Sequence, residues 1–136
     1  MTPQKALIKL RSLLLDNLHE GYNLGAVILD KRGCILNWGF NSYIKTHPAM
    51  VLNRYYRVEQ IFVHAECDAI YSMSDKVTPH TMVIARINQH GDFLCAKPCV
   101  GCYSEIQKSG IKRVFYTESS GELAELDTSV SIDEYI

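Results

Sequence analysis

The sequence has no excess of charge of either sign. Its 14 lysines and arginines nearly balance 15 aspartates and glutamates, which gives a net charge of −1. A balanced chain has no strong overall attraction to nucleic acid or to a membrane surface, although a local basic patch would still bind anions. This balance excludes proteins whose binding depends on bulk positive charge.

The sequence also lacks a long hydrophobic run. No apolar stretch approaches the roughly 18–20 residues that a membrane-spanning helix needs. The apolar N-terminus carries Lys5, Lys9, Arg11 and Asp16 along its length, and no small-residue cleavage site follows it. A signal peptide has a different pattern, so residues 3–19 are predicted to form an amphipathic helix. The protein is expected in the cytoplasm, without a membrane partner.

The sequence also lacks the even number of cysteines that a set of disulfides would use. The chain has five cysteines, and two of them form a C-x-x-C motif. In a chain without an export signal, this pattern favours reduced thiols and metal binding over a disulfide framework. The 136 residues fit one domain, predicted to cover 1–136, and the 47% of hydrophobic residues can supply its core.

Hydrophobic periodicity gives the expected order of elements. Apolar runs predict strands at 24–30, 34–40, 81–87, 112–117 and 122–130. Helical spacing and capping signals predict helices at 3–19, at 64–74 and from Cys99 to about residue 109. The polar and aromatic segment 41–60 is predicted to be a long functional loop. This order predicts an α/β fold in which helices cover a sheet.

Two short motifs predict a zinc site. His64 stands in VHAECDAI, and Cys99 and Cys102 stand in KPCVGC. Imidazole and thiolate are zinc ligands, and a catalytic zinc keeps three protein ligands and one open position. Each motif lies at a predicted helix N-terminus, where exposed N–H groups favour thiolate over thiol. Pro98 fits the rigid entry to the second of these helices.

Glu66, two residues after His64, is the predicted catalytic residue. Positions i and i+2 of a helix are about 200° apart, so Glu66 does not share the ligand face. A metal lowers the pKa of a bound water toward roughly 7, and a nearby carboxylate can then carry the proton to the substrate. The pattern H-x-E followed by P-C-x-x-C is the signature of zinc-dependent base deaminases.

The chain resembles the cytidine deaminase-like superfamily over nearly its whole length. Three segments carry the resemblance: GAVILDKRGCILNWGFN (25–41), HAECDAI (64–70) and DFLCAKPCVGC (92–102). The resemblance implies a three-layer α/β fold with a mixed five-stranded sheet, a Zn²⁺ cofactor and hydrolytic deaminase activity. It also implies that Asn41 and Ala65 contact the substrate and that the protein forms a homo-oligomer, either a dimer or a tetramer.

The sequence departs from the family pattern at two points. Free cytidine deaminases have a ribose-binding glutamate two residues after the asparagine, where this chain has Tyr43. Deoxycytidylate and tRNA-type deaminases have a further helix that makes the last strand parallel, but only 19 residues follow Thr117 here. A parallel crossover needs a dozen or more residues before its strand returns. Strands four and five are therefore predicted to form an antiparallel hairpin.

Three functions remain open at this stage. The leading hypothesis is deamination of cytosine in a free (deoxy)cytidine nucleotide or nucleoside. The alternatives are a deaminase of cytosine or adenine in single-stranded DNA or RNA, and a non-enzymatic binding module whose structural zinc takes Cys67 or Cys95 as a fourth ligand. Five residues of the 41–60 loop are the remaining candidates for substrate binding: Tyr43, Lys45, His47, Arg54 and Arg57. Lys45, Arg54 and Arg57 would favour a substrate that carries a 5′-phosphate.

Overall fold

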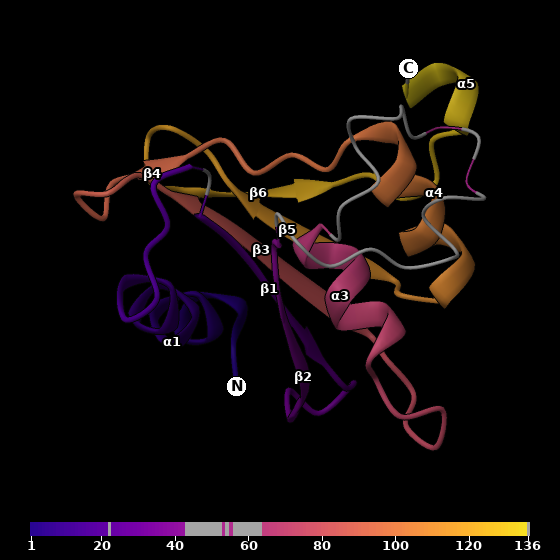
Figure 1. Cartoon of the computed structure of the whole chain (residues 1–136). Helices are drawn as coiled ribbons and strands as arrows, with labels where there is room; N and C mark the ends of the chain where they lie inside the picture. Colours follow the sequence, from indigo (N-terminus) through magenta and orange to yellow (C-terminus); the bar gives the residue numbers. More distant parts are fainter. Residues whose placement is uncertain (22, 43–52, 54, 56–63, 136) are drawn as a thin grey trace.

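The computed structural model describes residues 1–21, 23–42, 53, 55 and 64–135. The helices are α1 (Pro3–Leu15), α3 (Ala65–Tyr71), α4 (Val100–Ser109) and α5 (Ile132–Tyr135). The strands are β1 (Asn23–Leu29), β2 (Ile35–Phe40), β3 (Thr81–Ile87), β4 (Phe93–Leu94), β5 (Arg113–Thr117) and β6 (Leu123–Leu126). Figure 1 shows α1 on one side of the sheet and α3 and α4 on the other.

The sheet is mixed, and its strand order is β2-β1-β3-β5-β6, with β4 paired to β3. β3 and β5 run parallel, while the other pairs are antiparallel. Alternate residues of the central strands enter two separate cores. Val27 and Val83 pack with α1, whereas Ala26 and Ile84 pack with α3 and α4. The three-layer α/β fold predicted from the sequence is confirmed.

The first helix is shorter than predicted. Thr2 caps its N-terminus by accepting a hydrogen bond from the Lys5 N–H at 3.2 Å, and Pro3 follows in the first turn. The prediction of an end at residue 19 was wrong, because α1 ends at Leu15. The Asn17 side chain donates a hydrogen bond to the Leu13 carbonyl at 3.0 Å and so satisfies a carbonyl that the helix leaves without a partner.

The prediction of five strands was also wrong, because the described residues form a six-stranded sheet. The extra strand is β4, which is only two residues long. The last strand is shorter than 122–130, and the chain turns after it into the four-residue helix α5. Both differences concern elements too short for a periodic pattern to develop.

The antiparallel hairpin at the end of the sheet is confirmed. Val114 pairs with Leu126 and Thr117 pairs with Leu123. The turn is closed by a hydrogen bond from the Gly121 N–H to the Glu118 carbonyl at 2.9 Å, and Gly121 has a φ of +89° that favours glycine. Among the described residues, no helix has the length and apolarity needed to cross a membrane.

Candidate metal centre

The three predicted zinc ligands converge from two helix starts on the same face of the sheet. His64 is the N-cap of α3, and Cys99 is the N-cap of α4. Cys102 lies one turn into α4 and is completely buried. The residues come together because both helices start at the same end of the sheet.

The distances fit a tetrahedral zinc ion. The Nδ1 atom of His64 lies 3.2 Å from the Cys102 sulfur and 3.6 Å from the Cys99 sulfur. The ligand atoms of all three residues lie within 4.8 Å of one another. Two ligands at zinc–nitrogen and zinc–sulfur bond lengths on a tetrahedral ion are about 3.5–3.8 Å apart. One zinc ion therefore fits between the three side chains with little movement, and a fourth position is left for a non-protein ligand.

The electrostatics of the site favour a thiolate at Cys99. A hydrogen bond from Cys102 and another from His64 lower the pKa of Cys99 to about 4, against the opposing effect of burial. Burial raises the pKa of Cys102. Burial lowers the pKa of His64, but the hydrogen bond and negative charge of Cys99 outweigh this effect, so the pKa is raised. A dication that replaces these protons would stabilise both thiolates and neutral imidazole.

Glu66 lies beside this cluster, in the first turn of α3, and is only 4% exposed. Burial and then the charge of Cys99 raise the pKa of Glu66. The carboxyl group is therefore adjacent to the metal position and shielded from water.

Neither of the two cysteines considered as a fourth ligand belongs to the ligand group. Cys95 is exposed. Cys67 is fully buried, and its sulfur is 3.9 Å from that of Cys102. Among the described residues, however, the group of mutually close ligand atoms contains three members and does not include Cys67. The geometry thus favours an open, catalytic type of site over a closed structural one.

Two of the predicted substrate-binding residues are described by the structure. Asn41 lines a cavity of about 410 Å³ just beyond β2, and its side-chain oxygen accepts a hydrogen bond from the Leu24 N–H at 2.9 Å. Ala65 is 1% exposed and packs in the core formed with α3 and α4, and its contact with the substrate stays a prediction. The other five lie outside the described residues: Tyr43, Lys45, His47, Arg54 and Arg57.

A stacked pair of tyrosines, one in α4 and one in α5, supports the metal-binding turn, and no sequence motif pointed to this pair. The rings of Tyr103 and Tyr135 stack with centroids 3.9 Å apart and an angle of 4° between planes. The Tyr135 hydroxyl donates to the carbonyl of Pro98, the residue before Cys99. The Tyr103 hydroxyl donates to the Val130 carbonyl at 2.5 Å. Together these contacts attach α5 to the start of α4.

Asn53 also connects to α4. Its side-chain nitrogen donates to Glu105 Oε1 at 2.7 Å and to Ser104 Oγ at 3.1 Å. All three side chains are at most 9% exposed. The pairing satisfies polar groups that would be costly to bury alone. It fixes one point of the connection between β2 and α3 against the helix that carries both cysteines.

Glycine at position 39 allows α3 to approach β2 closely enough to place His64. A Cβ atom at Gly39 would lie 2.3 Å from the Ala65 carbonyl oxygen and 2.3 Å from the Ala69 nitrogen, both backbone atoms. We expect Gly39→Ala to reduce the free energy of unfolding by about 1–3 kcal/mol, as overpacking does, and to weaken zinc binding. Denaturant unfolding and zinc titration measure the two effects.

Gly110→Ala is the control for this substitution, because no atom lies within 4 Å of the added methyl group. Because Gly110 has a φ of +84°, the substitution should be mildly destabilising, but the zinc affinity should not change. A Gly39→Ala protein with parental stability and zinc affinity would contradict this packing of α3 on β2.

Comparison with known proteins gives a consistent picture. Residues 4–118 match the family model described as the cytidine and deoxycytidylate deaminase zinc-binding region. The fold is similar to that of cytidine deaminase from Mycobacterium leprae, with a TM-score of 0.52, 13% identity, and coverage of 88% of this chain and 92% of that one. It is also similar to dCMP deaminase from the cyanophage S-TIM5, solved with dCMP and dUMP, with a TM-score of 0.52, 22% identity and 89% coverage of both chains. Comparison with curated protein sequences found no significant match.

Proposed function

The chain belongs to the cytidine and deoxycytidylate deaminase family, and from this membership we propose that it hydrolyses the exocyclic amino group of cytosine in a free (deoxy)cytidine nucleotide or nucleoside. The observation that carries the proposal is the meeting of His64, Cys99 and Cys102 beside the buried carboxyl group of Glu66. The reaction consumes water and yields the uracil compound and ammonia.

The cofactor is zinc, since the matching family region is zinc-binding and the three ligand atoms fit this ion. His64, Cys99 and Cys102 would hold it. When bound, zinc makes a nucleophilic water available near neutral pH. The protein then has to provide proton transfer, orientation of the base and exclusion of bulk water.

Glu66 provides the proton transfer. Its carboxyl group takes the proton released when water attacks the ring carbon and delivers it to the ring nitrogen, and a second transfer to the amino group makes ammonia the leaving group. Burial and the negative charge of Cys99 raise the pKa of Glu66. A carboxyl group with a raised pKa holds a proton more readily at neutral pH, as this role requires.

Asn41 is proposed to orient the sugar. Two hydrogen bonds between Asn41 and the backbone of Leu24 fix the residue at the end of β2: Leu24 N–H to the side-chain oxygen at 2.9 Å, and Asn41 N–H to the Leu24 carbonyl at 3.2 Å. The fold neighbour from the cyanophage was solved with dCMP and dUMP. That complex supports a pyrimidine nucleotide as the class of substrate to test first.

A substrate panel tests the proposal. We expect one zinc per chain by metal analysis and release of ammonia from at least one of dCMP, deoxycytidine and cytidine. A single-stranded oligonucleotide containing cytosine is included in the same assay. Zinc-loaded, folded protein that turns over only the oligonucleotide would move the assignment to nucleic acid. Protein that turns over none of the four would overturn the proposed activity.

The homo-oligomer and the cytoplasmic location expected from the sequence stay predictions. The same holds for the proposed contacts of Tyr43, Lys45, His47, Arg54 and Arg57 with the substrate.

A further inference from the structure

The C-terminal helix α5 has only four residues, Ile132–Tyr135. A helix of this length has no stability of its own in water, so contacts with the rest of the chain must hold it. Ile132 and Tyr135 both pack against the core that contains α3 and α4. The last residue of α5 also reaches the turn that carries Cys99.

Tyr135 contacts three residues around the start of α4. Its hydroxyl donates a hydrogen bond to the Pro98 carbonyl, and its ring stacks on that of Tyr103 with centroids 3.9 Å apart. The Lys97 ammonium lies 5.2 Å from the centroid of the Tyr135 ring, within the range of a cation–π contact. Lys97 and Pro98 directly precede Cys99 in the chain. Two of the three contacts therefore act on the residues that lead into this ligand.

Cys99 is placed where regular structure gives it little support. Residues 95–98 lie in neither a helix nor a strand, and Cys99 is the N-cap of α4. The residues preferred at an N-cap have an oxygen that accepts hydrogen bonds from the first turn, whereas sulfur is a weaker acceptor. The Cys99 sulfur also has to lie near His64, 3.6 Å from its Nδ1 atom.

The two tyrosines hold the peptide groups on both sides of Cys99. The carbonyl before Cys99 is that of Pro98, a buried residue, and it accepts from the Tyr135 hydroxyl. The carbonyl of Cys99 itself accepts from the Tyr103 N–H at 2.8 Å. The direction of a side chain follows from the peptide groups on either side of its Cα atom. Fixing both groups therefore fixes where the Cys99 sulfur points.

The helix α4 in turn holds the segment that precedes α5. The Tyr103 hydroxyl donates to the Val130 carbonyl at 2.5 Å. The Gln107 side chain donates to the same carbonyl at 3.0 Å and to the Thr128 carbonyl at 3.3 Å. The metal-binding helix and the C-terminal segment are thus attached to each other at both ends.

We propose that Tyr135 is a positioning residue that holds Cys99 in place for zinc, so that α5 determines how tightly the metal is bound. Without the Tyr135 hydroxyl, the Pro98 carbonyl loses this hydrogen bond and the turn is less restrained. Part of the binding free energy of zinc is then used to bring Cys99 back into position, which raises the dissociation constant. The proposal concerns the metal centre and does not depend on which cytosine compound is the substrate.

The test is the zinc affinity of two variants, measured by competition with a chromophoric chelator. Tyr135→Phe keeps the ring and its stacking but removes the hydroxyl. It should weaken zinc binding by about 2- to 10-fold, the range that the net loss of one hydrogen bond gives. Tyr135→Leu also removes the stacked ring and should weaken binding by roughly 10- to 100-fold, as the loss of groups that orient metal ligands typically does.

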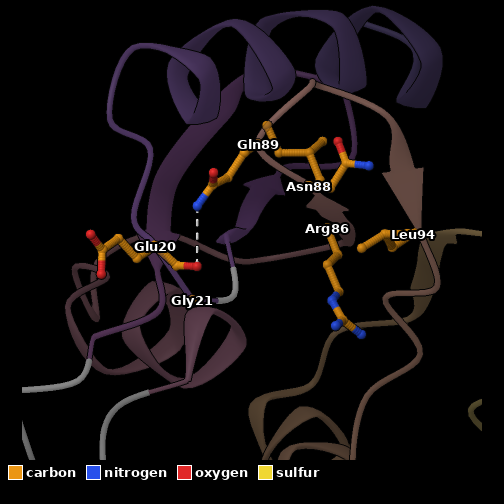
Figure 2. Close-up of a pocket in the computed structure, with 7 residues that line it drawn as sticks. Glu20, Gly21, Arg86, Asn88, Gln89 and Leu94 are labelled. Atoms are coloured by element: carbon orange, nitrogen blue, oxygen red, sulfur yellow. Dashed lines mark hydrogen bonds between the residues drawn. The ribbon is translucent and has the colours of Figure 1, made fainter.

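Gln89→Met is the matched control. The Gln89 side chain also donates to a backbone carbonyl, that of Glu20 at 3.2 Å (Figure 2). Methionine is of similar size but has no donor. Gln89 lies in the turn between β3 and β4, which Figure 1 shows well away from α4. The Gln89→Met protein should therefore bind zinc with parental affinity.

Denaturant unfolding of the zinc-free proteins and turnover at saturating zinc separate positioning from other roles. Parental zinc affinity in both Tyr135 variants, with reduced stability, would overturn the proposal and leave Tyr135 a structural residue. An equal loss of affinity in Gln89→Met would also overturn it. At saturating zinc, the Tyr135 variants should recover nearly parental kcat and KM, and a loss of kcat that zinc does not restore would place Tyr135 at the reaction instead. If no cytosine compound is turned over, the proposed function fails, while the zinc affinities still decide the role of Tyr135.

Discussion

Glu66→Gln should retain one zinc per chain and lose activity by more than the roughly 100-fold that a general acid–base group typically contributes. Glutamine is nearly the same size as glutamate, so it fills the same buried position beside Cys102. The glutamine side chain cannot take a proton from water and return it to the base. It also lacks the negative charge with which the carboxylate interacts with the metal. Turnover of the best substrate from the panel, with metal analysis on the same sample, measures both quantities.

Glu122→Gln is the control. Glu122 is exposed in the turn between β5 and β6, so this substitution makes the same chemical change far from the metal centre. It should keep parental activity. If the Glu66→Gln protein turned over at the parental rate, Glu66 would not be the proton carrier. If it lost zinc as well, the loss of activity would have to be attributed to the metal.

Cys102→Ala should reduce zinc affinity by more than the roughly 10–100-fold that the loss of a group supporting a ligand costs. Three side chains hold the ion, and the substitution removes one of two sulfur ligands. Metal binding is coupled to stability, so the variant should also unfold at lower denaturant concentration when zinc is present. A competition titration with a chromophoric chelator measures the affinity.

Cys67→Ala gives a close comparison, because Cys67 is equally buried and its sulfur is only 3.9 Å from that of Cys102. It should bind zinc with nearly parental affinity while losing some packing. A Cys67→Ala protein that lost its zinc would point to a fourth protein ligand, and the open position required for hydrolysis would then be absent.

The metal centre could be predicted from the sequence because its residues stand at fixed positions in two helix starts. His64 and Cys99 both prove to be N-cap residues, and Cys102 follows within the first turn. The final hairpin could be predicted because only four residues separate the strand patterns at 112–117 and 122–130, too few for a parallel crossover. Both inferences depended on local spacing alone.

Other features depend on contacts that no local pattern contains. The end of α1 is set by the Asn17 side chain, and the short α5 is held by the stacking of Tyr135 on Tyr103.

The division of the sheet into two cores has a consequence for optical spectroscopy. The only tryptophan of the chain, Trp38, packs with the core that contains α1. It stands opposite Val27, on the face of the sheet that carries no metal ligand. Its fluorescence therefore reports on the α1 layer, and a change in its emission when zinc binds would have to be transmitted through the sheet. Tyr103 and Tyr135 lie next to the metal-binding turn, and Tyr71 packs against Cys67 and Cys102, so tyrosine absorbance is the more direct signal for that layer.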